Sequence, residues 1–219
     1  MSVAPAFDAG TYREGLRVSP AFQRNKEPIL EALRRHLPKP SDDSTEPLRV
    51  LEIASGPGEH AAHWATEFGA YAFQPTEHDG GALDSIRLYT QGLANVAAPL
   101  QLDAAAPELW QVEPASCTAV VAVNLCHISK LEASQGLMQG AARVLRPGGR
   151  LCVYGPFLID GKPTTDSNGA FDASLRARDS SWGIRDVAAL DCFGAPDLAR
   201  VAMDDMPSNN FFAVWERRP

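Results

Sequence analysis

Short apolar runs recur along the chain and are separated by polar turns or by stretches with helical spacing. Five of these runs predict strands, at residues 48–54, 70–73, 99–102, 118–123 and 150–154. Before the last of these, residues 137–145 place apolar side chains on one helix face, and Pro147 ends that helix. Because strands and helices alternate, the pattern predicts an α/β fold with a doubly wound, mostly parallel sheet and helices on both faces.

Further elements are expected at both ends of this core. Asn25 is a favourable N-cap for an amphipathic helix, and the polar, Pro-rich residues 38–47 connect that helix to the first strand. Beyond the core, residues 184–193 predict a helix. Two apolar runs at 198–203 and 210–215 flank a turn and predict an antiparallel hairpin at the C-terminal end.

Composition and charge narrow the function classes. The 219 residues are 45% hydrophobic and carry a net charge of −7. The longest apolar runs are far shorter than the ~20 residues needed to cross a bilayer, so we expect no membrane partner. An acidic chain without a basic stripe is a poor ligand for phosphate backbones, which argues against binding to bulk nucleic acid. The first ten residues resemble no secretory signal, so a cytoplasmic protein is expected. The oligomeric state is left open.

Cysteine and histidine give little indication of metal chemistry. The chain has four widely spaced cysteines, Cys117, Cys126, Cys152 and Cys192. Without a C-x-x-C pair or a secretory context, they are expected to be reduced and mostly buried. Glu59, His60 and His63 fall on one predicted helix face and are the one hint of a metal site. Since no further ligand is clustered with them, we expect no bound metal.

The first predicted strand runs into a loop of small residues. This stretch, residues 52–58, reads Glu-Ile-Ala-Ser-Gly-Pro-Gly, and a ligand in such a sheet is expected beyond the carboxyl ends of the strands. Gly56, Gly58 and Ala61 also match the dinucleotide fingerprint G-x-G-x-x-A, which is weak alone. Glu52 discriminates between ligands, because an acid within an apolar strand needs a partner. The pyrophosphate of a dinucleotide gains nothing from a nearby carboxylate. The ammonium and sulfonium groups of S-adenosylmethionine are positively charged and would be stabilised by it.

Acids also follow the next two predicted strands. Glu77 lies nineteen residues beyond Gly58, a spacing suited to a carboxylate that accepts both ribose hydroxyls, in NAD as well as in an adenosyl ligand. Asp103 ends the third strand, where an acid can accept the exocyclic amine of adenine. Each acid taken singly has an ordinary alternative as a surface acid or helix cap. Three acids at three successive strand ends favour an adenosyl ligand.

These motifs resemble class I S-adenosylmethionine-dependent methyltransferases. More closely, the chain resembles the methyltransferase-like protein 26 family, also known as domain of unknown function 938. The matching stretches are residues 24–30, 51–60, 74–79, 127–129, 145–149, 154–157 and 168–186. The resemblance implies a seven-stranded Rossmann-like sheet with an antiparallel last strand. Two departures are Pro57, where the family usually has Thr or Ser, and Glu77, where Asp is common. Neither forbids cofactor binding.

The resemblance also implies the cofactor, S-adenosyl-L-methionine, with S-adenosyl-L-homocysteine as product. The expected cofactor-binding residues are Arg24, Asn25, Glu52, Ala54, Ser55, Gly56, Gly58, Glu77, Asp103, Asn124 and Leu125. The methyl acceptor is expected beyond the fourth strand, near His127. This side chain is either a general base, since imidazole titrates near physiological pH, or a hydrogen-bonded structural histidine. Methyl transfer from a sulfonium relies chiefly on positioning, so a base is not required.

The long segment after residue 155 is expected to select the substrate. Within it, only residues 173–177 have helical character, and a loop of this length is usually functional. The expected substrate-binding residues in and near it are Tyr154, Phe157, Asn168, Phe171, Asp172, Arg176 and Trp182. Alternatively, Arg176 and its neighbouring cation pair with acids such as Asp172 and only attach the segment to the domain.

The sequence therefore predicts a single methyltransferase-like domain that acts on a small molecule. Its expected parts are an N-terminal arm and helix at 1–47, a cofactor-binding core at 48–155, a substrate or lid segment at 156–182 and a C-terminal helix and hairpin at 183–219. Two alternatives remain. One is a non-catalytic module that binds S-adenosylmethionine or a protein partner; the other is an NAD-type oxidoreductase, which Glu52 and the modest chain length disfavour.

Overall fold

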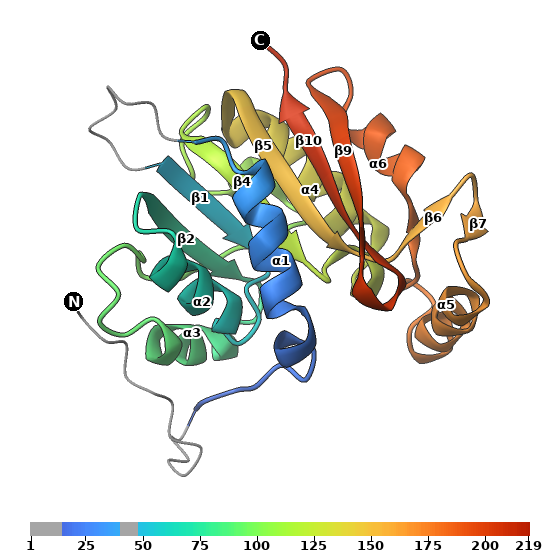
Figure 1. Cartoon of the computed structure of the whole chain (residues 1–219), viewed down its shortest axis with the longest axis horizontal. Coiled ribbons are helices and arrows are strands. Elements are labelled where there is room, and N and C mark those ends of the chain that lie inside the picture. Colours follow the sequence, from blue (N-terminus) through green and yellow to red (C-terminus); the bar gives the residue numbers. More distant parts are fainter. Residues whose placement is uncertain (1–14, 40–47) are drawn as a thin grey trace.

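A seven-stranded sheet organises the molecule (Figure 1), seen here in a computed structural model that describes residues 15–39 and 48–219. The strand order is β3-β2-β1-β4-β5-β10-β9. The strands are β1 (Leu48–Ile53), β2 (Tyr71–Glu77), β3 (Leu100–Gln101), β4 (Cys117–Val123), β5 (Leu145–Gly155), β9 (Leu198–Met206) and β10 (Asn210–Arg217). Strands β1 to β5 pair in parallel, whereas β10 is antiparallel to both β5 and β9. The expected α/β class, the mostly parallel sheet and the C-terminal hairpin are confirmed.

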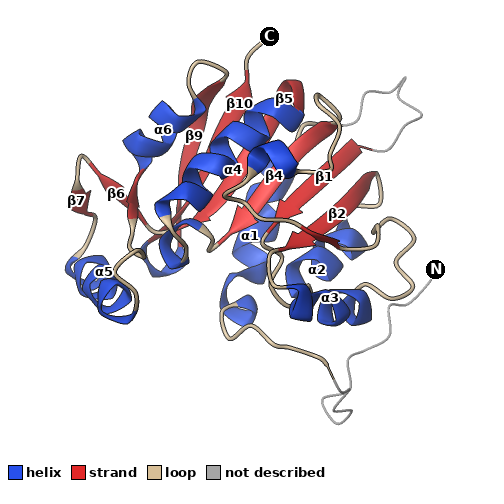
Figure 2. Cartoon of the chain, turned by 180° about the vertical axis from the view of Figure 1, so that it is seen from behind, coloured by secondary structure: helices blue, strands red, loops and turns tan. Residues whose placement is uncertain are grey.

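Helices cover both faces of this sheet (Figures 1 and 2). One face carries α1 (Phe22–His36), α2 (Glu59–Glu67) and α3 (Leu83–Tyr89); the other carries α4 (Leu131–Val144) and α6 (Val187–Gly194). Short 3-10 turns complete the core: η1 (Gly80–Ala82), η2 (Pro107–Leu109), η3 (Cys126–Ile128) and η4 (Pro207–Asn209). Among the described residues, no helix is both long enough and apolar enough to span a bilayer.

Two apolar layers lie on either side of the strands. Leu51 and Ile53 of β1 point toward α4 and α6, while Val50 points toward α1 and α2. This alternation follows from the two-residue period of a strand, so Glu52 shares the α1 side with Val50. Both faces of β1 and β4 are covered, which is why the buried positions of these strands are mostly apolar and why a buried carboxyl group in β1 is exceptional.

Two expectations about local structure were wrong. Helix α1 begins at Phe22 with Ala21 at its N-cap, and Asn25 lies buried inside the helix. The stretch 145–149 is the irregular start of β5, which pairs with β4 across a register shift. The connector expected at 38–47 falls mostly outside the described residues.

The segment expected to be a long loop is in fact folded. It contains β6 (Phe157–Ile159), β7 (Lys162–Pro163), α5 (Asp166–Arg178) and β8 (Arg185–Asp186), and the three strands form a small sheet in the order β7-β6-β8. Figure 1 shows this unit projecting beyond β9 and β10, with α5 at its outer end. We call residues 156–186 the insertion, because they separate β5 from α6.

Candidate functional site

The loop after β1 makes a sharp left-handed turn. Ala54, Gly56 and Gly58 have φ angles of 58°, 56° and 98°. The turn is fixed from the neighbouring strand, because Ser55 donates its N–H to the carbonyl of Thr76 at 2.8 Å. A Cβ on Gly58 would lie 2.7 Å from the backbone of Ile86, so only glycine fits there. A Cβ on Gly56 would meet nothing within 4 Å, so this backbone is accessible to a ligand.

Glu52 lies directly below this loop with its carboxyl group buried. The side chain is 2% exposed, and its Oε2 atom has no hydrogen-bond partner. Burial raises the pKa of Glu52 to about 7; a hydrogen bond from Ser55 opposes the shift, and the negative charge of Glu77 adds to it. A buried carboxyl oxygen without a partner is costly, so a cation or a hydrogen-bond donor at this position would be stabilising.

Glu77 and Asp103 follow the next two strands, as the spacing predicted. The Oε2 atom of Glu77 accepts a hydrogen bond from the N–H of Gly56 at 2.8 Å, and its Oε1 atom accepts one from the N–H of His78 at 2.8 Å. Asp103 is exposed and caps its own turn by accepting the N–H of Ala105 at 2.8 Å. The structure therefore brings Glu52, the glycine loop and Glu77 together, with Asp103 beyond the adjoining strand.

Helix α1 contributes a second unpartnered polar group on the same face of the sheet. Asn25 is 4% exposed; its Oδ1 atom accepts a hydrogen bond from Nε2 of His60 at 3.0 Å, while its Nδ2 atom has no partner. Burial, with a smaller contribution from His63, lowers the pKa of His60 to about 4, so this ring is neutral at physiological pH. Arg24 is exposed and donates to the carbonyl of Pro20 at 2.8 Å.

Glu59 and His60, two of the three residues that gave the one hint of a metal site, contact other parts of the protein. Glu59 accepts the N–H of Ser19 at 2.6 Å, and His60 packs edge-on against the ring of Phe22. Asn25 was expected to bind the cofactor, but its position inside α1 was not expected, because the helix was predicted to start at this residue. A bond of Asn25 to a histidine 35 residues away is a tertiary contact that no local pattern predicts.

The loop after β4 forms the other side of the switch point in strand order. Asn124 has a φ of 56° and donates its N–H to the carbonyl of Tyr154 at 2.9 Å, and the half-buried Leu125 precedes η3. His127 is 6% exposed, and neither of its ring nitrogens has a hydrogen-bond partner among the residues described. Burial and the charge of Arg185 lower the pKa of His127 to about 4. The ring is therefore neutral at physiological pH.

Three hydrogen bonds join the insertion to the loop that carries His127, and a fourth bond, made by Arg185, lies within the insertion. Gly183 donates its N–H to the carbonyl of His127 at 3.1 Å. The guanidinium of Arg185 donates to the carbonyls of Cys126 at 3.1 Å, Ser129 at 2.6 Å and Ser181 at 2.8 Å. Three of these four bonds end on residues 126–129, so the insertion determines where this loop lies. Arg185 was not predicted as a site residue, and its acceptors are backbone carbonyls that leave no signal in a sequence.

The other insertion residues divide into structural and accessible groups. Asp172 accepts the N–H of Ile184 at 2.6 Å and pairs with Arg176 at 2.8 Å, as in the ion-pair alternative. Asn168 donates to the carbonyl of Asn209 at 2.9 Å. Phe157 is 1% exposed and belongs to the hydrophobic core, so its expected contact with substrate is corrected: it packs against protein.

The aromatic residues near the end of β5 remain candidates for substrate contact. Phe171 is 37% exposed and lies edge-on to His127, with 5.7 Å between ring centroids. Trp182 is half-buried in the turn after α5, and Tyr154 is buried at the end of β5. Burial raises the pKa of the Tyr154 phenol. The accessible aromatic surface thus lies beside the neutral imidazole.

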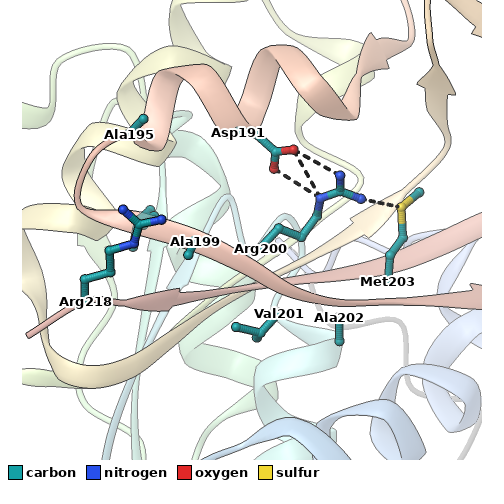
Figure 3. A pocket seen from close by; sticks show the side chains of 9 residues that line it. Asp191, Ala195, Ala199, Arg200, Val201, Ala202, Met203 and Arg218 are labelled. Atoms are coloured by element: carbon teal, nitrogen blue, oxygen red, sulfur yellow. Dashed lines mark hydrogen bonds and ion pairs between the residues drawn. The ribbon is translucent and has the colours of Figure 1, made fainter.

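Two surface pockets lie away from the glycine loop. The first, of about 530 Å³, lies on the edge strand β9 beside α6 (Figure 3). Two of its charged residues pair with each other, Asp191 with Arg200 at 3.0 Å, and Asp191 also accepts the indole N–H of Trp215 at 2.7 Å. The second, of about 580 Å³, lies between the insertion and the tip of the β9–β10 hairpin, near Lys162 and Phe211. Neither contains residues of the strand-end site.

The strand order, the antiparallel β10 and the glycine loop at the switch point together define the class I S-adenosylmethionine-dependent methyltransferase fold. Solved structures with the same fold include the S-adenosylmethionine-dependent methyltransferase SibL in its apo form, which is 19% identical with a TM-score of 0.64. The match covers 90% of this chain and 56% of SibL. Human N-acetylserotonin methyltransferase in complex with S-adenosylmethionine is 10% identical with a TM-score of 0.68, covering 91% of this chain and 53% of that enzyme.

A third similar structure is the complex between the Haloferax volcanii Trm112 methyltransferase activator and the putative methyltransferase. It is 12% identical with a TM-score of 0.69, and the match covers 91% of this chain and 92% of that chain. By contrast, the chain spans only a little over half the length of SibL and of the human enzyme. Its own family is defined by sequence: residues 16–217 match the model described as "Protein of unknown function (DUF938)", and the chain belongs to that family.

Proposed function

We propose that this protein is an S-adenosylmethionine-dependent methyltransferase that acts on a small molecule. The observation that carries the proposal is the buried, unpartnered carboxyl group of Glu52 below an accessible glycine loop. The methyltransferase fold and the resemblance to the methyltransferase-like protein 26 family support the same function. An NAD-type reaction gains nothing from a carboxyl group at this position.

The polar groups on the α1 side fit the amino-acid end of this cofactor. That end is a zwitterion, with an ammonium and a carboxylate on one carbon. Glu52 offers an unpartnered carboxyl oxygen and Asn25 an unpartnered amide N–H, so each buried group has a counterpart of the right polarity. Arg24, exposed on α1, supplies a nearby positive charge for the carboxylate.

The adenosine end fits the strand ends on the other side of the glycine loop. Glu77 accepts N–H bonds through both of its oxygens, and a ribose diol supplies two donors of the same kind. Asp103 follows β3 and is exposed. One of its oxygens accepts the N–H of Ala105 and the other lies 3.8 Å from Nδ1 of His78, but a carboxylate has further acceptor capacity for the adenine amine. The backbone at residues 54–58, including Ser55, is close enough to the accessible face of Gly56 to contact the cofactor between these two ends.

When bound, S-adenosylmethionine would supply a methyl group carried on a sulfonium; the bond between that methyl carbon and sulfur breaks by direct displacement, leaving S-adenosylhomocysteine. The lone pair of the acceptor forms the new bond to carbon, and the acceptor proton leaves to solvent or to a nearby base. The part played by this chain is chiefly to hold the acceptor in line, which accounts for most of the barrier reduction in such reactions. Asn124, Leu125 and the neutral ring of His127 lie where the acceptor approaches.

His127 fits a positioning role better than that of a strong base. With its pKa lowered to about 4, the imidazole accepts a hydrogen bond but seldom holds a full proton at pH 7. The accessible surface around it is aromatic, from Phe171 and Trp182, and is bounded by the paired Asp172 and Arg176. This lining favours a neutral, partly apolar small molecule.

A thermal-shift panel tests the proposal. S-adenosylmethionine or S-adenosylhomocysteine should raise Tm, whereas NAD and NADP should not. No shift with either adenosyl ligand at millimolar concentration, using folded protein, contradicts the proposal. Binding without transfer of labelled methyl to any component of a cell extract would favour the non-catalytic module instead.

A further inference from the structure

The carboxyl group of Glu52 has no cation to balance a negative charge. Two groups act on it directly: Ser55 donates a hydrogen bond, and Glu77 of β2 is a second acid whose charge raises the pKa of Glu52. The buried polar groups on the same side of the sheet are Asn25 of α1, His60 of α2 and Tyr154 of β5. Of these, His60 is neutral and the Tyr154 phenol is protonated. In the neighbouring strand β4, the residues on this side, Ala119 and Val121, are apolar. Arg24 of α1 is exposed, and it is not among the groups that shift the pKa of Glu52.

The geometry alone determines which form of Glu52 is favoured in the ligand-free protein. A carboxylate that is 2% exposed, with one oxygen unpartnered and a second acid on the adjoining strand, has lost its hydration without gaining a counter-charge. Protonation removes that charge, and the pKa of Glu52, raised to about 7, agrees. The neutral acid is therefore well populated near physiological pH.

We propose that binding of S-adenosylmethionine or its product expels the proton of Glu52 into solvent, so that cofactor occupancy is coupled to pH. The carboxyl O–H bond breaks, and the ammonium of the bound cofactor becomes the counter-charge that the protein itself lacks. This inference rests on the proposed function, since it requires a ligand with an ammonium group. It goes beyond that function because it makes the protonation state of one residue a control on binding.

The coupling has a defined size. Only the ionised fraction of Glu52 binds well, and that fraction falls to about one tenth at pH 6, one unit below the pKa of about 7. Apparent affinity for cofactor should therefore be about tenfold weaker at pH 6 than at pH 8. His60 cannot be the source of the proton, because it is already neutral at pH 6.

Calorimetric titration with S-adenosylhomocysteine measures the proton directly. At pH 6, repeated in buffers of different ionisation enthalpy, the native chain should release about one proton per ligand, and at pH 8 about one tenth. The infrared carbonyl band of a protonated carboxyl group should disappear on binding at pH 6. Glu52→Gln should bind more weakly, release no proton and lose the tenfold pH dependence. Glu113→Gln, at an exposed acid, is the matched control and should behave as the native chain.

The outcomes separate this inference from the proposed function. Binding of S-adenosylhomocysteine with no proton release at pH 6 overturns the inference and leaves the methyltransferase proposal intact. Proton release that persists in Glu52→Gln also overturns it, since another group would then be the source. No binding by the folded native chain at either pH overturns both.

Discussion

The backbone N–H of Gly56 donates a hydrogen bond to the carboxylate of Glu77 at 2.8 Å. The two residues end neighbouring parallel strands, and their bond closes the glycine loop against the end of β2. The acid expected to hold the ribose is therefore already aligned by the loop beside which the cofactor would lie. Its two oxygens accept backbone donors from both sides, so the carboxylate is held in place before any ligand arrives.

Replacing Glu77 should weaken binding of the cofactor without unfolding the chain. Glu77→Ala removes acceptors for two ribose hydroxyls, each bond to a charged group being worth about 1.5–3 kcal/mol. Two such bonds correspond to about 3–6 kcal/mol, so we expect the Kd for S-adenosylhomocysteine, measured by calorimetry, to rise by at least about 100-fold.

Two further variants separate the contact from its charge. Glu77→Asp keeps the carboxylate and shortens it by one methylene, so it should retain most of the affinity. Glu113→Ala removes an acid from an exposed position and should leave Kd unchanged. If Glu77→Ala binds as tightly as the native chain, Glu77 does not contact the cofactor.

A second prediction concerns the accessible face of the glycine loop. Gly56→Ala places a methyl group in space that the structure leaves open, where the cofactor should lie. We expect affinity for S-adenosylhomocysteine to fall by on the order of tenfold, with Tm lowered by only a few degrees because the left-handed turn costs alanine about 1 kcal/mol.

Gly92 provides the matched control for backbone strain. It also has a positive φ, of 84°, and a Cβ there also meets nothing within 4 Å. Gly92→Ala should lower Tm by a similar amount and leave cofactor affinity unchanged. Equal losses of affinity in the two variants would show that strain, rather than occupied space, is responsible.

A third prediction is that Glu52 lowers the free energy of unfolding of the ligand-free protein at neutral pH. Its pKa is raised from the ordinary value of 4.5 to about 7 in the folded chain, so the unfolded chain loses this proton first as pH rises. Stability is therefore fully present below pH 4.5 and declines as pH rises to about 7. Glu52→Gln removes that decline, and its gain in unfolding free energy should grow to about 3 kcal/mol by pH 8.

Urea unfolding at several pH values measures this gain. Near pH 4 the native chain and Glu52→Gln should have similar stabilities, because both side chains are then neutral. His60 and His127 act in the opposite sense in both proteins: their pKa values are lowered from 6.5 to about 4, so stability falls as pH drops through that range. A gain independent of pH would contradict the assignment to Glu52.

A fourth prediction concerns the link between the insertion and the loop after β4. Arg185→Gln removes a half-buried donor from the carbonyls of Cys126, Ser129 and Ser181. We expect a loss of about 2 kcal/mol in unfolding free energy, since carbonyls deprived of a charged donor are costly to leave unsatisfied. The pKa of His127 should rise, because Arg185 is one of the two causes that lower it.

Histidine ring signals in an NMR titration report that pKa directly. Arg185→Lys keeps the charge but cannot reach three carbonyls, so it should lose stability while the pKa of His127 stays low. Arg178→Gln, at an exposed position of α5, should change neither quantity. If Arg185→Gln leaves the titration of His127 unchanged, the charge of Arg185 does not act on the ring.

The sheet and the strand-end acids were predictable from sequence because each has a local signal. Buried strands are continuous apolar runs, and a charged residue such as Glu52 is conspicuous within one. The prediction that it needs a partner is sharpened by the structure, in which the described protein supplies none for its Oε2 atom. Glu77 and Asp103 follow their strands directly, so their meeting at one edge follows from parallel topology.

The elements that sequence reasoning missed depend on contacts between distant residues. Strands β7 and β8 are two residues long, too short for any period to appear. Asn25 has the local preference of an N-cap, but it lies inside α1, where its side chain accepts a hydrogen bond from His60. Arg185 acts on carbonyls 56 and 59 residues away, and Phe157 is indistinguishable from a ligand-contacting aromatic until its burial is known.

The position of α1 bears on how the chain reaches its native state during synthesis. This helix packs on β5 and β10, and its last residue, His36, receives a hydrogen bond from Arg150 and pairs with Asp204. Helix α1 can meet α2 early, but it completes its contacts only after the C-terminal hairpin has left the ribosome. Until then the apolar face that includes Ile29 and Leu33 is only partly covered on the nascent chain.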